Sequence, residues 1–99
     1  MVRSMRSIII SPRIDAKLDA KHTVEREEIE QCFDNRCGFN LIDDREDHRT
    51  DPPTLWFIAQ TRTGRLLKII FIYKDGNIHV KSAYEPNEAE IAIYETEGK

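Results

Sequence analysis

The pattern of apolar and polar positions changes character about halfway along the chain. In the first half, apolar residues recur every three or four positions, at Ile14, Leu18, Ile29, Cys32 and Phe33. That period places them on one face of a helix. The second half contains three runs rich in β-branched and aromatic residues, 54–61, 65–73 and 78–84. This composition is typical of strands.

Side chains that cap helices mark three beginnings. Ser11 followed by Pro12 combines a hydroxyl N-cap with proline at the first helical position. Thr23, with glutamates in the turn that follows, predicts the start of a second helix. Asn87 and Glu90 form a capping box for a last helix.

Glycine turns separate the predicted strands. Asp75-Gly76 predicts a two-residue type I′ hairpin loop, and a turn at Gly64 precedes it. A short additional strand is expected over 39–42. The predicted fold is α+β: two N-terminal helices, an antiparallel β-meander of three to four strands and a C-terminal helix, in a single domain over 1–99.

The Asp75-Gly76 turn also predicts a register, because directly opposed residues share a face of the sheet. The face expected in the core comprises Leu67, Ile69, Phe71, Tyr73, Ile78, Val80 and Tyr84. The other face is half apolar and half cationic, and comprises Lys68, Ile70, Ile72, His79, Lys81 and Ala83.

Composition narrows the function classes. The 99 residues carry a formal charge of −3, and no apolar run approaches the ~20 residues of a membrane span. The apolar run near the N-terminus is too short for a signal peptide, so we expect a cytoplasmic protein without membrane contact. The charge is unevenly spread, since 54–84 holds five cations against one carboxylate. Such a local field suits a phosphate-bearing ligand.

The cysteines and the acidic loop suggest no cofactor. Cys32 and Cys37 are expected to be free thiols, with Cys32 a small buried residue on a helix. A zinc site that adds His48 is the alternative, but the cysteine spacing is wider than usual and no second pair exists. The acidic run in 43–51 indicates a solvated loop rather than a magnesium site. We therefore expect neither a metal nor a cofactor.

Two blocks of the chain resemble the BrnT family of toxins. Residues 21–34, KHTVEREEIEQCFD, resemble the family's KHGV…EE…VF signature. Residues 64–95 resemble its tail, which begins with GR and an apolar run and ends in SA…E…YE. The corresponding positions there are Gly64, Arg65, Ile78, Val80, Ser82, Ala83, Glu90, Tyr94 and Glu95. The resemblance implies a RelE-like fold and a ribonuclease toxin that is paired with an antitoxin.

The chain departs from the family pattern in two places. Tyr84 stands where the family usually has arginine after Ser-Ala. Pro52, Pro53 and Thr54 stand where the family usually has acidic residues and an arginine that lead into the second strand. The nearest substitutes for these are Arg45, His48 and Arg49.

Metal-independent RNA cleavage needs a base, a cation and an acid. The catalytic candidates are Lys68, His79, Lys81 and His48. The candidates for binding RNA or an antitoxin are Arg45, Arg49, Arg65, Lys21, His22 and Tyr84. The competing interpretation of Lys68 and Lys81 is a solvated sheet face, with counter-charge from the acidic loop or from glutamates of the last helix. Lys21 and His22 also suit the C-terminal end of a helix dipole, the role we favour for them.

Three functions are open at this point. The first is a BrnT-like toxin, whose partners would be RNA and a cognate antitoxin, for instance of the ribbon-helix-helix type; a homo-oligomer is compatible with this. The second is a non-catalytic binding module on the same fold. The chain also resembles short bacterial proteins catalogued as ADP-ribosyl-(dinitrogen reductase) hydrolases. True ADP-ribosylglycohydrolases are far larger, all-helical and hold paired magnesium ions. The length of this chain and its lack of matching motifs therefore disfavour this third function.

Overall fold

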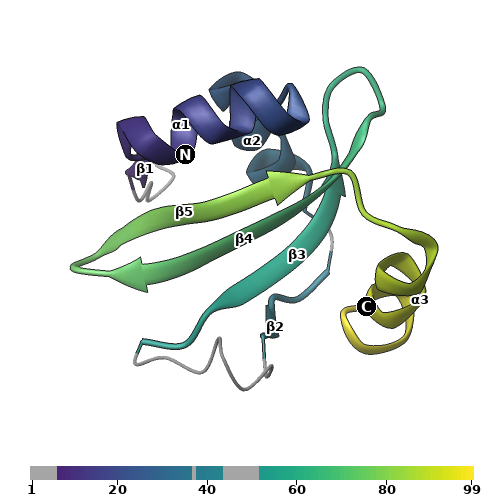
Figure 1. The fold of residues 1–99 in the computed structure, drawn as a ribbon. Helices are drawn as coiled ribbons and strands as arrows, with labels where there is room; N and C mark the ends of the chain where they lie inside the picture. Colours follow the sequence, from purple (N-terminus) through teal and green to yellow (C-terminus); the bar gives the residue numbers. More distant parts are fainter. Residues whose placement is uncertain (1–6, 37, 44–51) are drawn as a thin grey trace, which may run out of the picture.

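The computed structural model describes residues 7–36, 38–43 and 52–99. Its elements are β1 (Ile8–Ile9), α1 (Pro12–Lys17), the π-helical turn η1 (Leu18–His22), α2 (Arg26–Asn35), β2 (Leu41–Ile42), β3 (Leu55–Gln60), β4 (Leu66–Lys74), β5 (Asn77–Tyr84) and α3 (Glu88–Glu97). The fold class is α+β, as the sequence predicts (Figure 1).

The five strands form one sheet in the order β1-β5-β4-β3-β2. Strands β2 to β5 pair with one another in antiparallel fashion. The sheet is nevertheless mixed, because β1 runs parallel to β5 along its outer edge. The sequence pattern does not reveal β1, because its apolar run is too short to show a period. Its pairing with β5 satisfies backbone groups at that edge, where the amide of Ile78 donates to the carbonyl of Ser7 at 2.9 Å.

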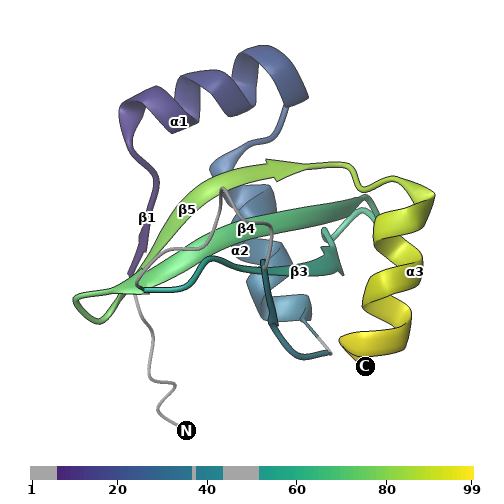
Figure 2. The same ribbon diagram turned by 60° about the horizontal axis from the view of Figure 1, so that its bottom comes forward.

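Helices lie on both faces of the sheet. In Figure 1, α1 and α2 lie above the strands and α3 lies below one end of them. Figure 2 shows α2 behind the strands and α3 beside that same end. On the α2 face, the ring of Phe33 packs edge-on against Phe57, with centroids 4.8 Å apart. On the other face, Tyr94 of α3 contacts Trp56 at 5.7 Å. Adjacent strand residues such as Trp56 and Phe57 point to opposite faces, so each helix layer receives one of them.

The first and last helices begin where their caps predict. The Ser11 hydroxyl accepts from the amide of Ile14 at 3.3 Å, and Pro12 occupies the first turn. At α3, the Asn87 side chain accepts from the amide of Glu90 at 2.8 Å, and the Glu90 carboxylate accepts in return from the Asn87 amide at 3.0 Å. Both capping expectations are confirmed.

The second helix begins later than predicted. Thr23 does not cap α2; it ends η1 in the left-handed conformation, with φ of 52°. Glu25 is the N-cap instead, and Glu28 accepts from its amide at 3.0 Å. The buried side chain of Val24 lies between these two positions. Burying it requires the chain to reverse at Thr23, which explains why the local capping preference does not decide the boundary.

The Asp75-Gly76 hairpin is confirmed, since both residues have positive φ, 54° and 77°. The predicted register holds for the pairs next to the turn, Lys74 with Asn77, Tyr73 with Ile78 and Phe71 with Val80. Beyond them the prediction is wrong by one residue, because Ile70 opposes Ser82 and Lys81 is left without a partner. This is a β-bulge.

The bulge exchanges two residues between the faces. Ala83 lies opposite Ile69 and joins the core face, where it is fully buried. Tyr84 lies opposite Lys68 and therefore belongs to the α3 face rather than to the predicted core face. No glycine or other turn residue marks this position in the sequence, so the pattern of apolar residues does not reveal the bulge.

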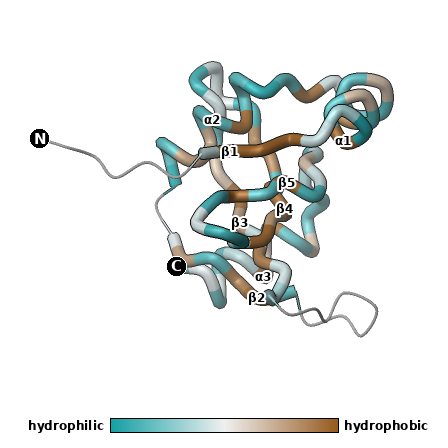
Figure 3. The backbone as a smooth tube through the Cα atoms, turned by 90° about the vertical axis from the view of Figure 1, so that its left-hand side faces the viewer, coloured by the Kyte–Doolittle hydropathy of each residue, from teal (hydrophilic) through white to brown (hydrophobic). Residues whose placement is uncertain are grey.

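The core lies mainly between the sheet and the N-terminal helices. Its largest fully buried side chains include Phe57, Phe71, Leu18, Ile29, Leu67 and Ile69. Figure 3 shows the hydrophobic segments gathered on the strands and the polar ones on the outer turns of the helices. Phe71 is fully buried, as the register predicts. Its ring contacts Phe33 of α2 at 5.3 Å.

Candidate functional site

Several of the predicted site residues lie together where β4 begins and β5 ends. Lys68 and Tyr84 oppose each other across these strands. The imidazole of His22, from the end of η1, lies 5.7 Å from the Tyr84 ring. We call Lys68, Tyr84, His22 and Glu90 the sheet-end cluster. It unites residues from three distant parts of the chain.

Lys68 is almost completely buried in this cluster. Its side chain is 9% exposed, and its Nζ lies 2.6 Å from a carboxylate oxygen of Glu90. The same Nζ lies 4.4 Å from the centre of the Trp56 ring and 5.7 Å from that of Tyr84. A buried ammonium group requires a counter-charge, and aromatic faces add a favourable electrostatic contact. Strands β3 and β5 supply the rings, and α3 supplies the carboxylate.

Glu90 has two tasks. One carboxylate oxygen accepts from the Asn87 amide at the start of α3, and the other accepts from Lys68 and from the Tyr84 hydroxyl at 3.1 Å. Burial raises the pKa of Glu90, but the hydrogen bonds from Lys68 and Asn87 and the charge of Lys68 outweigh it and lower that pKa. The carboxylate therefore stays ionised at neutral pH.

Tyr84 is held in its protonated form. Burial raises its pKa most, and the hydrogen bond and charge of Glu90 raise it further, while the charge of Lys68 acts in the opposite direction. At neutral pH its hydroxyl thus donates a hydrogen bond and does not serve as a base. The cluster combines a cation, a protonated phenol and a nearby imidazole.

The other two catalytic candidates of the sheet lie elsewhere. His79 pairs with Ile72, four residues along β4 from Lys68, which corresponds to about 13 Å of strand. Lys81 is exposed at the bulge, and Ser82 takes the place opposite Ile70 that the predicted register assigned to Lys81. The expected group of Lys68, His79 and Lys81 is not assembled. The counter-charge of Lys68 is a glutamate of the last helix, which is the alternative that the sequence left open.

His79 has an unusual environment. Its Nε2 atom is buried, and the described part of the chain offers it no hydrogen-bond partner. Its neighbour on the other side is Ile9 of β1. The residue lies in an apolar part of the sheet, away from the sheet-end cluster.

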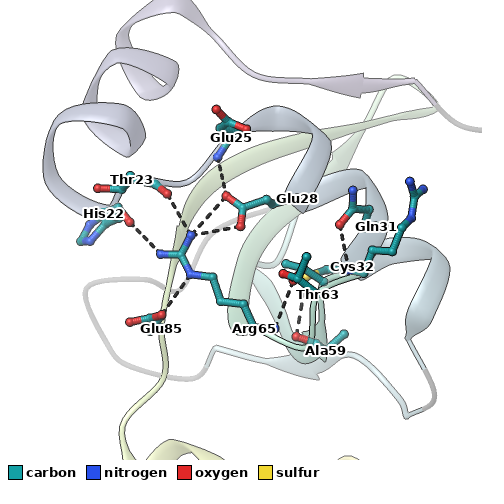
Figure 4. A network of polar contacts seen from close by, with 12 residues as sticks. His22, Thr23, Glu25, Glu28, Gln31, Cys32, Ala59, Thr63, Arg65 and Glu85 are labelled. Atoms are coloured by element: carbon teal, nitrogen blue, oxygen red, sulfur yellow. Dashed lines mark hydrogen bonds and ion pairs between the residues drawn. The ribbon is translucent and has the colours of Figure 1, made fainter.

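Arg65 joins three elements beside the cluster (Figure 4). Its guanidinium donates to the backbone carbonyls of His22 and Thr23, both at 2.9 Å. It also donates to both carboxylate oxygens of Glu28, at 3.1 and 3.2 Å, and to Glu85 at 3.0 Å. Partial burial lowers the pKa of Arg65, but the hydrogen bonds to Glu85 and Glu28 outweigh it and raise the pKa. With so many donors engaged, the guanidinium stabilises the η1–α2 junction against the sheet.

The remaining predicted residues are placed as follows. Lys21 is exposed at the end of η1, next to His22. Arg45, His48, Arg49 and Cys37 lie outside the described residues, and so does most of the acidic run in 43–51. Elsewhere in the chain, no group of three His, Cys, Asp or Glu side chains is arranged to hold a metal ion.

Cys32 is buried in α2, as expected. Its thiol lies 3.6 Å from the carbonyl oxygen of Ala59. Burial raises its pKa to about 12, with a further contribution from the charge of Glu28. It therefore stays a neutral thiol at physiological pH, which is the behaviour of a small core residue.

The sequence did not place Trp56 in the site, and it did not show which glutamate of the last helix reaches Lys68. The turn at Gly64 does not define a register, so the sequence cannot assign Trp56 to a face of the sheet. The sequence predicts Glu90 as a capping residue, and the structure confirms this role. That its second oxygen reaches Lys68 depends on how α3 packs against the sheet.

No protein-family model matches the chain, and no curated protein matches it significantly. No helix within the described ranges is long and apolar enough to cross a membrane.

Proposed function

We propose that this protein is a BrnT-like toxin of a toxin–antitoxin pair, a metal-independent ribonuclease on a RelE-like fold. The observation that carries the proposal is the Arg65 network. Arg65 belongs to the GR of one resembling block, whereas His22 and Glu28 belong to the KH and EE of the other. In the fold, Arg65 binds the His22 carbonyl and the Glu28 carboxylate directly. The two resembling blocks therefore meet in one network, which supports the resemblance.

The sheet-end cluster offers groups suited to RNA cleavage. The 2′-hydroxyl of the substrate would lose its proton to a base and attack the adjacent phosphorus, and the 5′-oxygen would leave with a proton from an acid. The imidazole of His22 is our candidate for the base, and the Tyr84 hydroxyl for the acid. The ammonium of Lys68 would stabilise the charge that develops on the phosphate.

One observation favours the non-catalytic alternative. Glu90 already neutralises Lys68 at 2.6 Å, so a phosphate at this place competes with a carboxylate of the protein itself. A binding module on the same fold would keep this pair closed permanently. A ribonuclease would need the substrate phosphate to share or replace the Glu90 contact.

The two functions are separated by a growth assay and a cleavage assay. Induction of the protein alone should arrest growth, and co-expression of the adjacent open reading frame should relieve it. Purified protein should cleave RNA in the presence of EDTA. Tyr84→Phe should reduce the cleavage rate more than tenfold, whereas Tyr73→Phe, the matched change at the other end of β4, should not. Binding of the neighbouring gene product without growth arrest or cleavage would support the binding module instead.

A further inference from the structure

Outside the sheet-end cluster, three cations form a row along the first helix. Arg13, Lys17 and Lys21 are spaced four residues apart over α1 and η1, and all three are exposed. Residues at this spacing are neighbours on one side of a helix, about 6 Å apart along its axis. We call these three residues the basic row.

Among the described residues, ion pairs do not neutralise the basic row. Within 7–36, 38–43 and 52–99, no carboxylate forms an ion pair with any of its members. The acidic residues of the same helix, Asp15 and Asp19, line a groove toward α2 together with Glu25 and Glu27. Positive and negative side chains are thus separated onto two sides of one helix.

This arrangement is unfavourable for the isolated helix. Like charges four residues apart repel each other, whereas opposite charges at that spacing stabilise a helix. The same chain uses the favourable arrangement elsewhere, in Arg26–Glu30 of α2 and in Glu95–Lys99 at the end of α3. An anionic partner would turn the repulsion within the row into a binding contribution.

The row also leads to the sheet-end cluster. Lys21 is followed directly by His22, whose ring lies 5.7 Å from that of Tyr84. A chain that carries one negative charge per residue and lies along the row would therefore reach the cluster at its Lys21 end. A nucleic acid strand has this regular spacing of charge, and basic surfaces of single-strand binders follow it.

We propose that the basic row holds the phosphate backbone of single-stranded RNA and directs the strand into the sheet-end cluster. This proposal deepens the proposed ribonuclease function, on which it rests, by adding Arg13 and Lys17 to its substrate-binding surface. The contacts are with phosphates, so the row contributes affinity without base preference.

The test compares two variants with the same change in charge. Lys17→Gln/Lys21→Gln removes two cations of the row, and Arg62→Gln/Lys74→Gln removes two exposed cations outside it that also form no ion pair in the described part of the chain. The probe is a fluorescein-labelled single-stranded RNA with 2′-O-methyl sugars, which cannot be cleaved through the 2′-oxygen. Fluorescence anisotropy of the full chain gives the affinity as a function of salt, and circular dichroism verifies the fold of each variant.

The expected result is a difference in salt dependence. Each phosphate contact on a single strand contributes about 0.7 to the slope of log K against log salt, so the row variant should lose about 1.4. The control variant should keep the wild-type slope. An equal loss of slope in both variants would show that only net charge matters, and it would overturn the proposal. A wild-type slope in the row variant would also overturn it. Tighter wild-type binding to a polyglutamate peptide or to phosphatidylserine vesicles than to RNA would also overturn it.

The assay separates this proposal from the ribonuclease itself. Binding is measured on an RNA that cannot be cleaved, so a row-dependent salt slope together with inactivity on ordinary RNA supports the row and refutes only the catalytic proposal. Cleavage of ordinary RNA together with an unchanged salt slope in the row variant refutes only the row.

Discussion

Removal of the Glu90 carboxylate tests the buried ion pair between Lys68 and Glu90. Glu90→Ala leaves the ammonium of Lys68 in a place where its side chain is only 9% exposed. The same change removes the group that accepts from the Asn87 amide at the start of α3. Both consequences destabilise the folded protein, and they act at the same junction between helix and sheet.

The magnitude follows from the burial of the pair. Loss of one partner from a buried ion pair costs about 3–5 kcal/mol, because the other charge stays buried without compensation. We expect the lower end, about 3 kcal/mol, since the rings of Trp56 and Tyr84 still face the ammonium. Loss of the capping contact adds about 1 kcal/mol. The total of about 4 kcal/mol is a large fraction of the 5–15 kcal/mol typical of a small domain.

Replacement of Lys68 should be much less costly. Lys68→Met places an apolar side chain against Trp56. Glu90 keeps its contacts with Asn87 and Tyr84, and water reaches its carboxylate because its side chain is 19% exposed. The double variant Lys68→Met/Glu90→Gln keeps an amide oxygen for the cap and buries no charge. We expect it to lie within about 1.5 kcal/mol of the wild type.

Urea unfolding at pH 7, followed by the fluorescence of Trp56, measures all of these variants. Glu90→Gln and Lys68→Met complete a double-mutant cycle with the double variant. We expect a coupling energy between positions 68 and 90 above about 1 kcal/mol. A cost below about 1 kcal/mol for Glu90→Ala, with additive single changes, would refute the reasoning.

The same pair predicts a dependence of stability on pH. The pKa of Glu90 is lowered by folding from its ordinary value of 4.5. Its contribution is therefore fully present above that value and is lost as the pH falls through the lowered pKa of the folded state. Acid should narrow the stability difference between the wild type and Glu90→Gln. A difference that stays constant from neutral pH to pH 3 would contradict this sign.

Three further predictions concern the core and the junction. Phe71→Ala should lower the free energy of unfolding by about 3–5 kcal/mol in urea unfolding. Phe39→Ala, at a side chain that is 74% exposed, should lower it by less than about 0.5 kcal/mol. Equal costs would disprove the assigned faces. Arg65→Lys should cost about 2 kcal/mol in the same assay, because an ammonium cannot reproduce the branched contacts with two carbonyls and two carboxylates. A cost near zero would show that those contacts do not stabilise the fold. In a Cys37→Ser background, Cys32 should react with a thiol reagent at pH 8 only on unfolding, since its pKa is raised to about 12; rapid modification of the native protein would contradict its burial.

Local chemistry in the sequence determined the elements and much of the core. Ser11 and Asn87 begin their helices because an N-cap depends only on groups three residues away. The Asp75-Gly76 turn sets the strand pairing next to it, and so places Phe71 in the core. These features need no knowledge of distant residues, and the pattern of the chain predicts them correctly.

Tertiary packing decided the rest. Thr23 ends a helix instead of beginning one, because burial of Val24 sets where the chain turns. The bulge at Lys81 moves Tyr84 to the α3 face, and α3 then brings Glu90 to Lys68. Sequence spacing predicts which side chains share an element, but a contact between elements depends on how they dock. The sheet-end cluster consists of such contacts, which is why its residues were mostly identified as candidates while their arrangement was not.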